Sequence, residues 1–171
     1  MHLLTSSLFL PTLVHGIKTH INKTRILRLY VSAMLFVMLL RGRPRIDPTL
    51  IMSYTDTPRS PDARGDPTES NPWSAILDDV IHAPDSHTVK SIRTLYYAAR
   101  QYGEKPAGTA IGAFGKDGTE ILEGTGKLDG TIFVRAAGVV MNTLGWVSHG
   151  QPEGNWDRSA LGWDEAWNTP D

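Results

Sequence analysis

Cysteine is absent from the 171-residue sequence, and this excludes two kinds of stabilising site. Disulfides cannot form, and a metal ion could be held only by His, Asp or Glu, because no thiolate is available. Complete catalytic motifs are also missing: the Gly-Lys pairs at 115–116 and 126–127 lack P-loop spacing, and Ser148 lacks a nucleophile elbow. The Asp and His residues at 78–87 are too local to predict a metal site. We therefore expect no catalytic residue, no cofactor and no bound metal, and we favour a protein that is not an enzyme.

Acidic residues are absent from the first 46 positions, which carry seven basic ones. The rest of the chain holds 10 basic and 18 acidic residues, a net charge of −8, although the formal net charge of the whole chain is only −1. Such unlike compositions predict two separately packed parts. We expect residues 1–51 to form a basic and apolar leader. It is either an extension outside the native protein, a membrane anchor, or a transit segment.

The longest apolar run is short. It occupies residues 29–40, and these twelve residues fall below the roughly 20 that a membrane-spanning helix needs. Basic residues flank the run on both sides, so they barely orient it with respect to a membrane. We expect a cytoplasmic protein, which would be anchored to a membrane only if residues 1–51 are genuine.

Residues 52–70 are predicted to be a disordered linker, because their Pro, Asp, Ser, Thr and Arg residues can bury little apolar surface. Order is expected to begin at Asn71, which can cap a short amphipathic helix whose first turn contains Pro72. A second helix is expected to begin after Asp85 or Ser86, to run to about residue 102, and to stop at Gly103. The two helices would form a helical hairpin.

After the helical hairpin the hydrophobic pattern changes to short β-branched and aromatic runs, at residues 107–114, 119–125 and 131–136. Asp-Gly pairs at 117–118 and 129–130 separate these runs, and Asp-Gly is typical of tight hairpin turns. Helical spacing returns after residue 136. The predicted fold class is α+β: a helical hairpin, a three-stranded antiparallel meander and a further helix, all within a small domain at 71–150.

The C-terminal tail, residues 151–171, is acidic and rich in tryptophan. Trp156, Trp163 and Trp167 recur at helical spacing, and tryptophan is a favoured anchor at protein interfaces. We predict that these three residues bind a protein partner or a second copy of the chain, unless the tail folds back over the sheet of its own domain. The preferred function is that of a small non-enzymatic binding or assembly protein.

Two alternative functions remain open. A basic and aromatic stripe along the second predicted helix consists of Lys90, Arg93, Tyr97 and Arg100. Such a stripe can lie on phosphates, and a helix pair followed by a β-hairpin resembles a winged helix, so the first alternative is a DNA-binding regulator. Its weakness is the acidic composition of the chain after residue 46. The second alternative is a membrane-anchored protein that displays the acidic domain.

Overall fold

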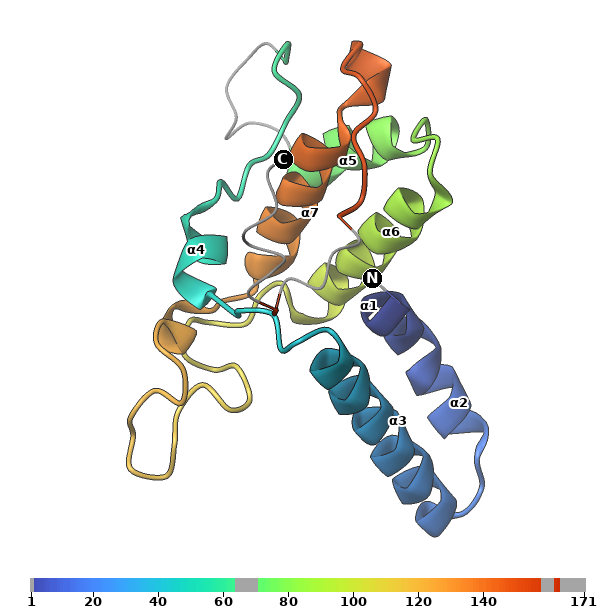
Figure 1. The fold of residues 1–171 in the computed structure, drawn as a ribbon, viewed down its shortest axis with the longest axis vertical. Coiled ribbons are helices and arrows are strands. Elements are labelled where there is room, and N and C mark those ends of the chain that lie inside the picture. The colour runs from blue at the N-terminus through green and yellow to red at the C-terminus, as the bar shows by residue number, and fades with distance from the viewer. Residues whose placement is uncertain (1, 64–70, 158–161, 164–171) are drawn as a thin grey trace. The chain divides into compact units, whose positions relative to one another are not determined.

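The computed structural model describes residues 2–63, 71–157 and 162–163 (Figure 1). The chain divides into two compact units. The larger contains the described part of Asp47–Trp156, and the smaller contains His2–Ile46 with the described residues beyond 156. Each unit is described by itself below.

Helices dominate the larger unit. They are α4 (Pro48–Ser53), α5 (Pro72–Val80), α6 (Ser86–Tyr102) and α7 (Ile132–Leu144), with two 3-10 turns, η2 (Thr125–Lys127) and η3 (Val147–His149). The predicted helix starts are confirmed: the side chain of Asn71 accepts from the Trp73 amide, and that of Asp85 accepts from the His87 amide. Both contacts satisfy amide groups that the first helical turn leaves without a partner.

The core of the larger unit lies where α5, α6 and α7 pack together (Figure 1). Its buried members are Ile76, Val80, Ile92, Leu95, Val134, Ala137, Met141 and Trp146. Trp146 is fully buried just after α7, and its indole N–H donates to the Asn142 side chain at 2.9 Å. This polar contact allows the largest core side chain to be buried without leaving its donor unsatisfied.

The predicted α+β class is wrong, because the described residues contain no sheet. A single isolated bridge joins Phe114 and Glu120. The third predicted strand is instead the first part of α7, where the buried residues Val134, Ala137 and Met141 recur at helical spacing. Cross-strand partners are what stabilise a strand, and Val134 is instead buried in the helix packing of the core.

The first predicted hairpin turn does form, but no sheet grows from it. Gly118 has a φ of +78°, and the Asp117 carboxylate accepts from the amide and the hydroxyl of Thr119. An isolated hairpin is only marginally stable in water unless a further strand pairs with it or another element packs on its face. The chain from Gly103 to Gly130 is therefore a long loop, closed at its base and without regular strands.

The segment after α4 packs on α7. Arg135 donates to the carbonyl oxygens of Met52 and Tyr54, and it forms an ion pair with Asp56 at 3.3 Å. Pro58 is buried, and a Cβ added to Gly138 would come within 2.5 Å of the Pro58 side chain. The part of the expected linker from Met52 to Pro58 thus contacts α7, and residues 64–70 are outside the described residues.

The smaller unit is a pair of helical segments. It contains α1 (His2–Ser6), the 3-10 turn η1 (Ser7–Phe9), α2 (Leu10–Gly16) and α3 (His20–Leu40). The Tyr30 hydroxyl links α3 to the first segment, through Ser6 at 3.0 Å and the Leu3 carbonyl at 3.3 Å. No residue of α1, α2 or α3 is buried. Of the helices in the described chain, none combines the length and apolar character needed to cross a bilayer.

Candidate functional site

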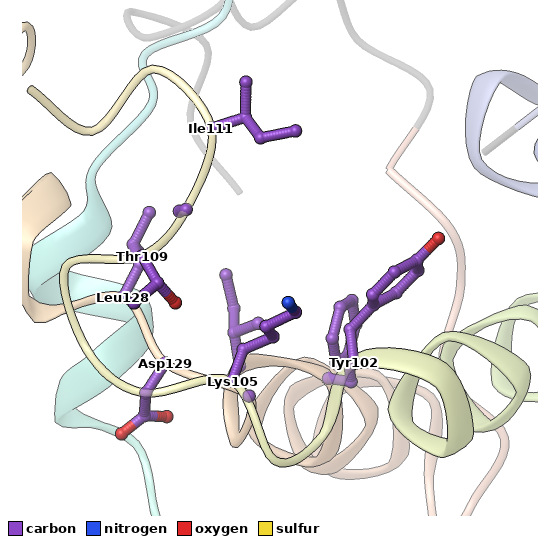
Figure 2. A pocket seen from close by; sticks show the side chains of 10 residues that line it. Tyr102, Lys105, Thr109, Ile111, Leu128 and Asp129 are labelled. Carbon is purple, nitrogen blue, oxygen red and sulfur yellow. The ribbon is translucent and has the colours of Figure 1, made fainter.

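A cavity of about 310 Å³ lies in the larger unit, between the end of α6, the loop that follows it and the start of α7 (Figure 2). Its lining consists of Tyr102, Lys105, Thr109, Ala110, Ile111, Leu128, Asp129, Gly130, Ile132 and Phe133. The lining is mainly apolar, with few polar groups. Concave sites of this size and character are typical of small-molecule binding.

Backbone contacts fix the base of the loop. The Gly130 amide donates to the Lys105 carbonyl at 2.8 Å, and the Gly108 amide donates to the Leu128 carbonyl at 3.2 Å. Gly130 lies so close to α6 that an added Cβ would overlap the carbonyl of Gly103. Glycine is therefore required where the end of the loop crosses the end of α6, and this crossing forms the floor of the cavity.

An aromatic pair forms one wall of the cavity. Tyr102 is the last residue of α6 and Phe133 is the second residue of α7, and their ring centroids are 6.4 Å apart with a tilt of 38°. Phe133 also packs against the core, whereas Tyr102 is 54% exposed. Phe133 thus anchors the wall to the core, and Tyr102 presents an exposed aromatic surface.

Two of the ten lining residues are charged, and they differ in what they contact. The Asp129 carboxylate accepts from the Thr131 amide at 2.8 Å and from the Thr131 hydroxyl at 2.5 Å. Figure 2 shows this carboxylate turned away from the cavity and Lys105 extending between Leu128 and Tyr102. Among the described residues, the Lys105 ammonium has no hydrogen-bond or ion-pair partner.

The glycine-rich stretch at 124–126 binds a carboxylate of the chain itself. The Glu120 side chain accepts from the amides of Gly124 at 2.8 Å and Gly126 at 2.7 Å. These two hydrogen bonds hold the pKa of Glu120 below its ordinary value. Amide groups that could have held a phosphate are therefore already occupied, which agrees with the absence of P-loop spacing. The Thr119 side chain and amide likewise lower the pKa of Asp117.

The two described tryptophans of those predicted to bind a partner lie outside helices. Trp156 is half-buried in a non-helical segment of the larger unit, and its indole nitrogen has no partner among the described residues. Trp163 is 52% exposed and belongs to the smaller unit. Trp167 lies outside the described residues. Binding of a protein partner by these residues stays a prediction.

The basic and aromatic stripe lies on the exposed face of α6. Its members, Lys90, Arg93, Tyr97 and Arg100, are all exposed, which fits the predicted spacing. Binding of nucleic acid by this stripe stays a prediction.

In the described ranges, no group of three or more His, Asp or Glu residues is placed to hold a metal ion. Asp85 contacts the His87 ring at 2.7 Å, in addition to capping α6.

A buried carboxylate that the sequence analysis did not single out links α5 to η3. Asp79 is only 1% exposed, and one of its oxygens accepts from the amide of Ser148 at 2.9 Å and from the Ser148 hydroxyl. Its second oxygen has no partner within the described part of the chain. Asp79 lies three residues after the buried Ile76 on α5, and this helical spacing was the signal that could have identified it.

The cavity residues were also missed by the sequence analysis. Gly103 as a helix stop and Asp129–Gly130 as a turn were the available signals, and both mark the cavity floor. What the sequence did not reveal is that these two glycine positions meet.

Part of the chain matches a known protein family. Residues 1–95 match a family model described as Questin oxidase-like. Neither the curated proteins nor the solved structures contain a match. The matched family is named after an enzyme, so the match does not support the non-enzymatic role expected from the sequence. The matched residues end within α6, and the cavity lining begins at Tyr102.

Proposed function

The chain belongs to the Questin oxidase-like family, and from this premise we propose that its larger unit binds a small organic substrate for oxidation. The observation that supports this most strongly is the apolar cavity at the end of α6. The family match supplies the class of reaction, and the cavity supplies a place for the substrate. The chain therefore contributes binding and orientation, which are general requirements of catalysis.

The shape of the lining favours a ring-bearing substrate. The Tyr102–Phe133 pair offers a tilted aromatic wall, and Leu128 and Ile132 add aliphatic surface beside it. Aromatic side chains pack well against flat rings, and burial of apolar area is the main source of affinity in such a site. Ile111 is fully exposed at the rim, where a bound molecule would cover it.

Filling the cavity tests this function. Ala110 lines the cavity and is exposed on the loop, so Ala110→Trp blocks the space without removing a core side chain. Ala107→Trp is the matched control, because Ala107 is exposed on the same loop and is not part of the lining. With 2-naphthamide as the probe, we expect Ala110→Trp to weaken binding by about tenfold or more, and Ala107→Trp to leave it within about twofold.

The oxidation itself is tested by dioxygen consumption with a panel of small aromatic compounds. A compound that the full chain oxidises should lose turnover in Ala110→Trp and keep it in Ala107→Trp. Equal binding of 2-naphthamide by both variants would show that the cavity is not the binding site. Turnover that survives in Ala110→Trp would place the reaction elsewhere in the molecule.

A further inference from the structure

We infer that the cavity selects molecules that carry an anionic group on an apolar body, and that Lys105 recognises the charge. This inference rests on the proposed function, because it assigns a substrate class to the same cavity. It concerns the side chain that determines specificity and does not assign a catalytic residue.

The backbone of Lys105 is held on both sides. Its amide donates to the Tyr102 carbonyl at 3.1 Å, and its carbonyl accepts from the Gly130 amide at 2.8 Å. These contacts fix the point from which the side chain starts, at the crossing that forms the cavity floor. Figure 2 shows the ammonium extending into the space between Leu128 and Tyr102. A lysine anchored in this way can place its charge against a ligand in the cavity.

No carboxylate neutralises this ammonium inside the described lining. Asp129 is the lining's acidic residue, and its carboxylate accepts two hydrogen bonds from Thr131. Its role is to hold the start of α7, where a carboxylate also suits the positive end of the helix dipole. Because the Asp129 carboxylate is turned away from the cavity (Figure 2), Lys105 is the charged lining residue that extends into the space, and a ligand anion would pair with its ammonium.

Lys105 is exposed in the structure, and an apolar ligand bound beside it would strengthen this preference. A charge pair that is partly removed from water interacts more strongly than one on the open surface, because the effective dielectric constant is lower. Leu128 and Phe133 flank the space that a ligand would fill, so a bound ring would displace water from around the ammonium. The ligand class that fits is a carboxylate, sulfonate or ionised hydroxyl attached to an apolar ring system.

Two probes of the same shape separate charge from apolar burial. The full chain is titrated with 2-naphthoate and with 2-naphthamide, which differ in charge and share the ring system. We expect the native chain to bind 2-naphthoate about fivefold more tightly or better. Lys105→Gln should abolish this preference and keep the affinity for 2-naphthamide within about twofold, whereas Lys105→Arg should retain the preference.

Lys116→Gln is the matched control, because Lys116 is exposed on the same loop and does not line the cavity. It should leave both affinities within about twofold. The inference is overturned if the native chain shows no preference, if Lys105→Gln keeps the preference, or if Lys116→Gln abolishes it equally. A third outcome is that Ala110→Trp weakens binding of 2-naphthamide but the native chain shows no preference for 2-naphthoate. The proposed function would then be supported, and the inference about Lys105 would be overturned. If neither probe binds the native chain, both the inference and the proposed cavity are overturned.

Discussion

Replacing Gly130 by alanine tests the crossing on which the cavity depends. An added Cβ would overlap the carbonyl group of Gly103 and would lie 2.6 Å from the carbonyl oxygen of Tyr102. Both neighbours are backbone atoms at the end of α6, where the Gly103 amide is bonded to the Ala99 carbonyl at 2.7 Å. The neighbours cannot rotate away as a flexible side chain would, so the loop itself must move.

Two costs determine the magnitude of this effect. Forcing an extra methyl group into a close-packed contact typically costs about 1–3 kcal/mol. Moving Gly130 also breaks its hydrogen bond to the Lys105 carbonyl, which adds about 0.5–1.5 kcal/mol. We therefore expect Gly130→Ala to lose about 2–4 kcal/mol of unfolding free energy. For a chain of this size, that lowers the melting temperature by roughly 5–15 °C.

Thermal unfolding of the full chain, followed by far-UV circular dichroism, measures this loss. Gly112→Ala is the comparison, because Gly112 has a φ of +81° and an added Cβ there would meet nothing within 4 Å. Its cost is the left-handed backbone alone, about 1–2 kcal/mol. If Gly130→Ala melts at or above the temperature of Gly112→Ala, the close crossing of loop and helix is refuted.

Two further predictions concern the loop and the segment after α4. Glu120→Gln should lower stability at neutral pH and lose its effect in acid. The folded pKa of Glu120 lies below its ordinary value of 4.5, so its contribution is present above pH 4.5 and disappears as the pH falls through the lower folded value. Urea unfolding at several pH values checks this, and a difference that persists in strong acid would contradict it. Arg135→Met should cost about 2 kcal/mol, because the carbonyls of Met52 and Tyr54 lose their donor. Urea unfolding measures this loss. The control is Asp56→Asn, which removes only the ion pair and should change the free energy of unfolding by less than about 1 kcal/mol. Equal losses in the two variants would refute the role of the backbone contacts.

The helix starts were predictable because their signals are local. Asn71 and Asp85 each supply an oxygen to an amide two residues later, and this geometry depends only on the nearest neighbours in the chain. The apolar spacing that follows each cap then identifies the buried side, although Ile81, which continues the apolar spacing just after α5, is 70% exposed. Local chemistry sets where a helix begins, whereas its packing determines which residues at the end of the face are covered.

The strands were mispredicted because β-branched residues were given more weight than the pattern that continues past them. Val134 and Ala137 belong to the same buried side as Met141 and Leu144, which places the whole stretch from Ile132 on one helix. Asp129 and Thr131 also form a local hydrogen-bonded turn just before that helix. An Asp-Gly pair is therefore compatible with a helix start as well as with a hairpin, and only the burial of the following residues distinguishes the two.

The charge of the cavity could not be read from composition for a related reason. The chain after residue 46 carries a net charge of −8, which by itself would favour cationic ligands. Three acidic residues of the loop are, however, hydrogen-bonded within it: Asp117 to Thr119, Glu120 to Gly124 and Gly126, and Asp129 to Thr131. Glu104, which precedes Lys105 in the chain, is exposed and does not line the cavity. At physiological ionic strength the remaining charges are screened beyond about 8 Å. A ligand in the cavity therefore experiences the Lys105 ammonium more strongly than the negative charge of the domain as a whole.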